Sequence, residues 1–111
     1  MVKNSIRMGT AADAALTHFS TLLRIRRKER KLTIAELADR LGVSVPTVRS
    51  LLAASPGVSI GTYFEAAHIL GVALFDPETS RFTATAAKDE KLETLLPQRV
   101  REKKVELDDD F

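Results

Sequence analysis

The sequence predicts an all-α fold with a helical body, a further helix towards the C-terminus and a flexible charged tail. Apolar residues recur at three- and four-residue steps along the first 96 residues, and residues that begin and end helices flank these segments. No segment of useful length in that region alternates like a strand. The chain has 111 residues, of which 44% are hydrophobic and 29% charged, which is typical of one globular domain with a short extension.

Composition excludes several classes of protein. The chain has no cysteine, which excludes disulfides, thiolate metal sites and cysteine catalysis, and which suits a reducing cytoplasm. The longest apolar stretch, Ile69–Phe75, is too short to span a bilayer. The first residues do not resemble a signal peptide. We therefore expect a cytoplasmic protein.

The charges are unevenly distributed along the chain. Residues 1–56 carry ten Lys or Arg and four Asp or Glu, whereas residues 57–111 carry seven basic and eleven acidic residues. A basic half next to an acidic half suggests that the first half binds a polyanion such as nucleic acid. The alternative is a solvated surface on which the charges happen to segregate.

The first predicted elements are an arm over residues 1–10 and a long helix from Ala11 to about Arg30. The helix ends in a basic run, residues 24–31, with six basic residues and one acid. Cations at a helix C-terminus also stabilise the helix dipole, so the run has a structural as well as a nucleic-acid interpretation. The apolar positions of the helix are Leu16, Phe19, Leu22, Leu23 and Ile25.

Two short helices follow. Thr33 and Glu36 form the pattern of a capping box, and Gly42 allows the left-handed turn that ends the helix. Ser44 can cap the next helix, which accepts Pro46 in its first turn and runs to about Ala54. The apolar positions of this pair are Ile34, Leu37, Ala38, Leu41, Val48, Leu51 and Leu52.

A loop over residues 55–59 precedes a fourth helix, Ile60–Leu70, which Ser59 caps and Gly71 ends. This helix is expected to bury Phe64, Ala67 and Leu70.

The remaining chain is expected to add helix after residue 71. Residues 72–75 allow a helical turn, and Asp76-Pro77-Glu78 is a helix-start signal. A C-terminal helix should cover about residues 84–96, ahead of Pro97. The expected organisation is an arm (1–10), a helical domain (11–75), a helical extension (76–96) and a charged tail (97–111).

The second and third helices carry the functional signal. Leu37-Ala38-x-x-Leu41-Gly42-Val43-Ser44-x-x-Thr47-Val48-x-x-Leu51 resembles the Xre/Cro family of bacterial and phage DNA-binding repressors. The resemblance spans about residues 16–75 and implies a five-helix, lambda-repressor-like helix-turn-helix domain, with the extra C-terminal helix outside it. It also implies a homodimer that binds a palindromic double-stranded DNA operator and places two recognition helices in successive major grooves.

Position by position, this resemblance implies a set of DNA contacts. Arg49 is the best candidate for a guanine, through its bidentate fork, and Val45 could contact a thymine methyl. The N-terminus of the second helix would contact a phosphate, and the basic run would add charge near the backbone. The implied DNA-binding residues are Arg27, Lys28, Thr33, Ile34, Ser44, Val45, Pro46, Thr47, Arg49 and Ser50.

The sequence also departs from the family. Ile34 stands where many members have glutamine, and Leu52 stands where many have a glutamate that pairs with the residue at Arg27. The loop 55–59 has no Lys or Arg. We therefore expect modest intrinsic affinity, with a larger share for DNA shape and dimerisation.

The C-terminal region carries a second resemblance. Residues 95–101 and the terminal Asp-Asp-Asp-Phe, residues 108–111, are similar to HipB-like antitoxins, which pair with HipA-family kinase toxins. This resemblance implies that Val105, Leu107 and Phe111 bind a HipA-like toxin protein. The alternative is a tail that only solubilises the protein.

No catalytic pattern is present. His18 and His68 lack neighbouring acids or cysteines in a useful pattern, and the sequence has no glycine-rich phosphate loop or nucleophile elbow. The sequence predicts no enzyme activity, no cofactor, no metal site and no membrane partner. It predicts a nucleoid-associated, autoregulating repressor, and an antitoxin if the second resemblance holds. The alternatives are a repressor without a protein partner and an adaptor that binds protein in place of DNA.

Overall fold

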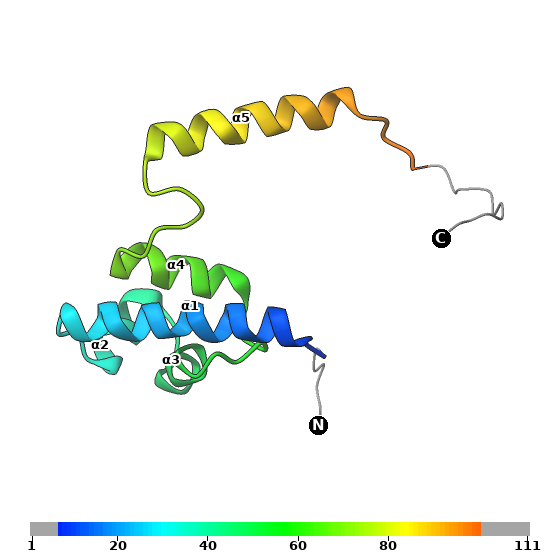
Figure 1. The fold of residues 1–111 in the computed structure, drawn as a ribbon. Coiled ribbons are helices and arrows are strands. Elements are labelled where there is room, and N and C mark those ends of the chain that lie inside the picture. The colour runs from blue at the N-terminus through cyan, green and yellow to red at the C-terminus, as the bar shows by residue number, and fades with distance from the viewer. Residues whose placement is uncertain (1–6, 101–111) are drawn as a thin grey trace. The chain divides into compact units, whose positions relative to one another are not determined.

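A computed structural model describes residues 7–100 of the chain. Those residues contain five α-helices and no strand (Figure 1), which confirms the all-α class: α1 (Thr10–Glu29), α2 (Ile34–Leu41), α3 (Val45–Leu52), α4 (Ile60–Leu70) and α5 (Thr79–Leu95). The chain divides into two compact units, one ending at Phe75 and the other beginning at Asp76.

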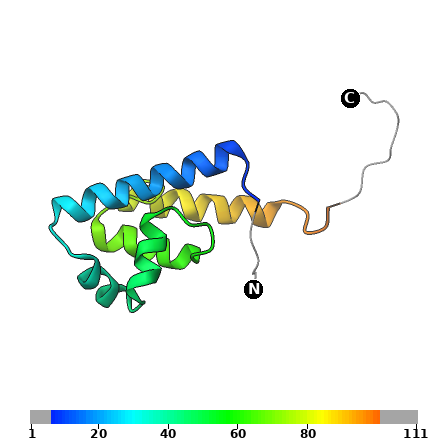
Figure 2. The same ribbon diagram turned by 90° about the horizontal axis from the view of Figure 1, so that it is seen from below.

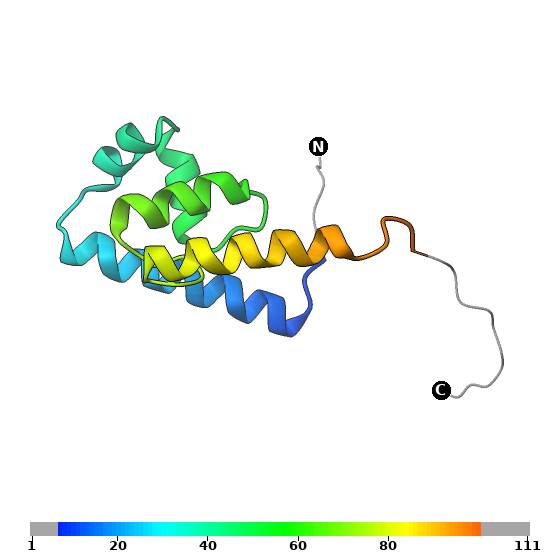
Figure 3. The ribbon, with the colours of Figure 1, turned by 90° about the horizontal axis from the view of Figure 1, so that it is seen from above.

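The first unit has a single apolar core. The helix α1 packs against α3 and α4, and α2 packs against the same two helices. In both turned views, α1 runs along one side of the other three helices (Figures 2 and 3). The buried apolar side chains are Leu23, Leu37, Ala38, Val48, Leu51, Leu52, Tyr63, Ala66, Ala67 and Leu70. This core fixes which face of each helix is left for binding.

The helix ends follow the signals in the sequence. The Thr33 and Glu36 capping box is complete, and Ser44 and Ser59 accept the backbone N–H groups of Thr47 and Thr62. The glycines that follow α2 and α4 have φ of 70° and 80°, the left-handed region in which a Cβ is unfavourable. These predictions are confirmed, together with the bounds of α4.

Two details of the first unit differ from the sequence prediction. The helix α3 stops at Leu52 because the chain turns at Ala54, whose φ is 63°. In α4, Tyr63 is buried, whereas Phe64 is only half-buried, with its ring centroid 6.2 Å from that of Phe75. Tyr63 tolerates burial because its hydroxyl donates to the Ser55 carbonyl at 2.6 Å.

The segment after α4 also differs. Residues 72–75 contain no helix, so residues 7–75 of the first unit hold four helices. The predicted start signal and C-terminal helix belong to one helix, α5, which begins at Thr79. No helix breaker lies between Thr79 and residue 84, so nothing separates the two segments. The expected tail beyond residue 100, with Val105, Leu107 and Phe111, lies outside the described residues, as do residues 1–6 of the arm.

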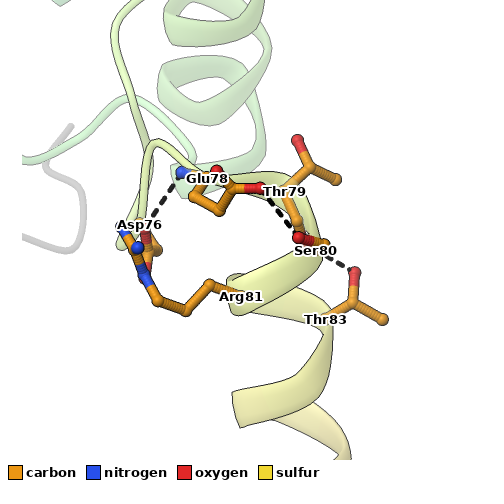
Figure 4. Close-up of polar contacts among 6 residues, drawn as sticks. All are labelled: Asp76, Glu78, Thr79, Ser80, Arg81 and Thr83. Carbon is orange, nitrogen blue, oxygen red and sulfur yellow. Dashed lines mark hydrogen bonds and ion pairs between the residues drawn. The ribbon is translucent and has the colours of Figure 1, made fainter.

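The start of α5 is held by a local polar cluster (Figure 4). Asp76 accepts the backbone N–H of Glu78 at 2.9 Å and two bonds from Arg81, at 2.7 and 2.8 Å. Glu78 in turn accepts the Ser80 hydroxyl at 2.7 Å. The Arg81 guanidinium, followed by the Glu78 amide, lowers the pKa of Asp76 below its ordinary value. Asp76 therefore turns the chain ahead of the helix, and Glu78 takes the N-cap position.

Candidate nucleic-acid interface

The helix α3 presents a narrow outer face. Its side chains Val48, Leu51 and Leu52 are buried in the core, so this face of the helix is turned inward. Pro46, Thr47, Arg49 and Ser50 lie away from that core, and all but the half-buried Thr47 are exposed; Val45 is half-buried and packs against the core. Four of the candidates from the sequence, Pro46, Thr47, Arg49 and Ser50, therefore share the outer surface of α3.

Arg49 is the strongest hydrogen-bond donor on this face. Its side chain is exposed, and no ion pair or hydrogen bond among residues 7–100 engages its guanidinium. A free guanidinium offers two parallel donors to the O6 and N7 acceptors of guanine. The geometry of the chain leaves Arg49 available for that contact.

Ser44 and Thr47 act first as helix caps. The Ser44 hydroxyl lies 3.3 Å from the Thr47 amide and 3.0 Å from the Thr47 hydroxyl. The capping role that the sequence suggests for Ser44 is confirmed. Any contact that these two hydroxyls make with DNA must therefore use their remaining hydrogen-bonding capacity.

A shallow groove of about 450 Å³ lies between α3, the loop after it and the start of α4. Most of its lining side chains carry hydroxyl groups, and none is charged. The lining residues are Pro46, Thr47, Ser50, Ser55, Gly57, Val58, Ser59 and Thr62. A polar groove without carboxylates next to α3 can accept a phosphate backbone without charge repulsion. Sequence reasoning described this loop only by its lack of basic residues and missed the cluster of hydroxyls.

The N-terminus of α2 is less open to phosphate than its position suggests. Glu36 accepts the Thr33 amide at 2.8 Å, and the Thr33 hydroxyl accepts the Glu36 amide at 3.0 Å. The carboxylate of Glu36 therefore sits at the same helix end that would receive a phosphate. Ile34 is half-buried and packs against the core, so its side chain contributes to stability.

Glu36→Gln should strengthen DNA binding because the amide keeps an acceptor oxygen for Thr33 and removes a negative charge near the phosphates. We expect a gain of a few-fold in affinity on any duplex, about 0.5–1 kcal/mol. Fluorescence anisotropy on two unrelated duplexes measures this gain. As a control, Glu65→Gln removes a charge from the exposed surface of α4. Equal gains in both variants would show that only net charge matters.

Two arginines of the basic run at the end of α1 donate hydrogen bonds to backbone carbonyls of other helices. The Arg24 guanidinium donates to the Leu52 carbonyl at 2.6 Å, and Arg30 donates to the Ile69 carbonyl at 3.2 Å. These carbonyls belong to the ends of α3 and α4, where cations also stabilise the helix dipole. The structural interpretation of the basic run therefore holds for these arginines.

Arg27 and Lys28 differ in how accessible they are. Arg27 donates to the Leu32 carbonyl at 2.9 Å, and its Nε is buried without a partner among the described residues. Arg27 therefore helps to shape the turn into α2, whereas Lys28 is exposed and free to contribute charge near DNA. The order of residues alone does not show this difference between Arg27 and Lys28, because the partner of Arg27 is a backbone carbonyl, that of Leu32.

We also searched the described residues for a metal site and for a membrane-spanning helix. His18 and His68 are exposed, and residues 7–100 hold no group of three His, Asp or Glu side chains placed to bind a metal ion. None of the five helices has the length and apolar character that a membrane span requires.

Comparison with known proteins gives one match within the described residues. Residues 23–76 match the family model described as helix-turn-helix. Searches of curated proteins and of solved structures gave no match. The matched segment contains α2, the left-handed turn at Gly42 and α3 with its free outer face, which is the arrangement that DNA-binding regulators of this type use. Residues 23–76, just under half of the chain, are therefore similar to helix-turn-helix domains, and this match supports a DNA-binding transcription regulator.

Proposed function

We propose that the protein is a transcriptional repressor that binds a palindromic operator in its own promoter as a homodimer. The observation that carries this proposal is the outer face of α3, where Arg49 is exposed and has no partner among residues 7–100, while the inner face packs in the core. A helix held in this way can enter a major groove and present the same side chains to every site.

Two further features support DNA as the partner. The polar groove between α3 and α4 lies next to the recognition face and has no charged lining residue. Lys28, Lys31 and Arg40 are exposed on the same unit and can attract phosphate through counterion release. In this proposal, the cations supply general attraction and the α3 face supplies discrimination.

A gel-shift titration tests the proposal. The protein is titrated on its promoter DNA and on a random duplex of equal length, at about 50 and about 200 mM salt. We expect preferential binding to the promoter, with both affinities falling as salt rises. Equal affinity for the two duplexes would leave only electrostatic attraction, and no binding to either would favour the protein adaptor.

The homodimer makes a geometric prediction in the same experiment. Two α3 helices of a twofold dimer reach half-sites about 10 base pairs apart, centre to centre. Changing that spacing by about five base pairs should therefore remove selective binding. The antitoxin role expected from the HipB-like resemblance stays a prediction, because Val105, Leu107 and Phe111, the implied toxin-binding residues, lie outside the described residues.

A further inference from the structure

The C-terminal end of α3 and the loop that follows it are held by three side chains from other elements. The Leu51 carbonyl accepts the Ser20 hydroxyl at 2.8 Å, and the Leu52 carbonyl accepts Arg24 at 2.6 Å. Three residues further on, the Ser55 carbonyl accepts the hydroxyl of Tyr63 at 2.6 Å. Thus, α1 and α4 both donate to the segment in which α3 ends.

The three donors are themselves well fixed. Ser20 is fully buried, and Tyr63 is 4% exposed. Burial raises the pKa of Tyr63 above its ordinary value, which already lies well above neutral pH, so the hydroxyl is a hydrogen-bond donor under ordinary conditions. Arg24 also donates to the Thr21 hydroxyl at 3.1 Å, which orients the guanidinium towards Leu52. Each donor is therefore set in place before DNA arrives.

These bonds add something that the apolar core does not supply. Hydrophobic contacts stabilise α3 but have little directional preference, whereas hydrogen bonds depend strongly on angle. The helix has only eight residues, so a small rotation at its end displaces Arg49 on its outer face. Recognition of base edges requires side chains to be held to within about 0.5 Å.

We propose that Ser20, Arg24 and Tyr63 are positioning residues that set the orientation of α3 for base recognition. This inference rests on the proposed DNA-binding function. It assigns a role in specificity to side chains of α1 and α4 that contact the C-terminal end of α3 and the loop after it. Their loss should therefore lower discrimination between sequences more than it lowers general attraction to DNA.

Arg24→Gln and Arg26→Gln form a matched pair that tests the inference. Both remove one positive charge from α1, but within the described part of the chain Arg26 makes only a 3.8 Å ion pair with Glu29. The probes are a duplex selected from a random pool by the unaltered protein and a scrambled duplex of equal length. Affinities are measured by anisotropy at a temperature at which circular dichroism shows both variants to be folded.

We expect Arg24→Gln to lose about tenfold more affinity for the selected duplex than Arg26→Gln does, with equal small losses on the scrambled duplex. Arg24→Lys should recover part of the discrimination, measured as the ratio of the affinity for the selected duplex to the affinity for the scrambled duplex. Tyr63→Phe keeps the ring and removes the donor, so it should lower the same ratio. The inference would be overturned if Arg24→Gln and Tyr63→Phe both showed the same ratio of selected-duplex to scrambled-duplex affinity as Arg26→Gln. If the unaltered protein selects no duplex, the proposed function itself fails, and the inference fails with it.

Discussion

Arg49→Ala should weaken binding to the selected operator by about 1–3 kcal/mol, or roughly 5- to 150-fold, and should relax the preference at one base pair. The expectation follows from the exposed, unpaired guanidinium on the outer face of α3. Affinities for operators with each of the four base pairs at every position measure both effects. The loss should be concentrated at a single guanine.

Arg40→Ala is the matched control because it removes the same side chain from the exposed surface of α2. It should lower affinity slightly and equally for all sequences, through the loss of one charge. An Arg49→Ala protein that keeps every base preference of the original would show that another residue reads the guanine.

Leu37→Ala should destabilise the domain by about 2–5 kcal/mol because the Leu37 side chain is fully buried where α2 meets the core. This loss approaches the whole stability of many small domains. DNA binding should then disappear at temperatures at which the unaltered protein still binds. Thermal and urea unfolding, followed by circular dichroism, measure the change.

Leu95→Ala provides the comparison, because the same substitution falls on a side chain of α5 that is 77% exposed. Its effect on unfolding should stay within about 0.5 kcal/mol. Equal destabilisation by the two substitutions would contradict the assignment of the core to the first unit.

Local signals in the sequence were enough to place most of the helices. The capping box at Thr33, the caps at Ser44 and Ser59, and the left-handed turn at Gly42 each depend on residues within three or four positions. Such short-range chemistry is visible in the order of residues. The helix-turn-helix unit was predicted for the same reason, since its caps, turn and apolar positions agree.

Long-range contacts set the limits of that prediction. Periodicity alone could not choose between Tyr63 and Phe64 for burial in α4, because the choice depends on the Ser55 carbonyl that receives the Tyr63 hydroxyl. Similarly, Arg24 and Arg30 bind carbonyls 28 and 39 residues away. The sequence shows a basic run, but only the fold separates its structural cations from those available to DNA.

The short connections between α1, α2, α3 and α4 bear on how quickly new copies become active. Helical domains with mostly local contacts fold in microseconds to milliseconds. Synthesis of a chain of 111 residues takes roughly 5–20 s at about 5–20 residues per second. Folding of the first unit therefore adds almost nothing to the delay between translation and occupancy of a promoter. In an autoregulated gene, the feedback would then follow the rates of synthesis and of subunit association, with no lag from folding of the first unit.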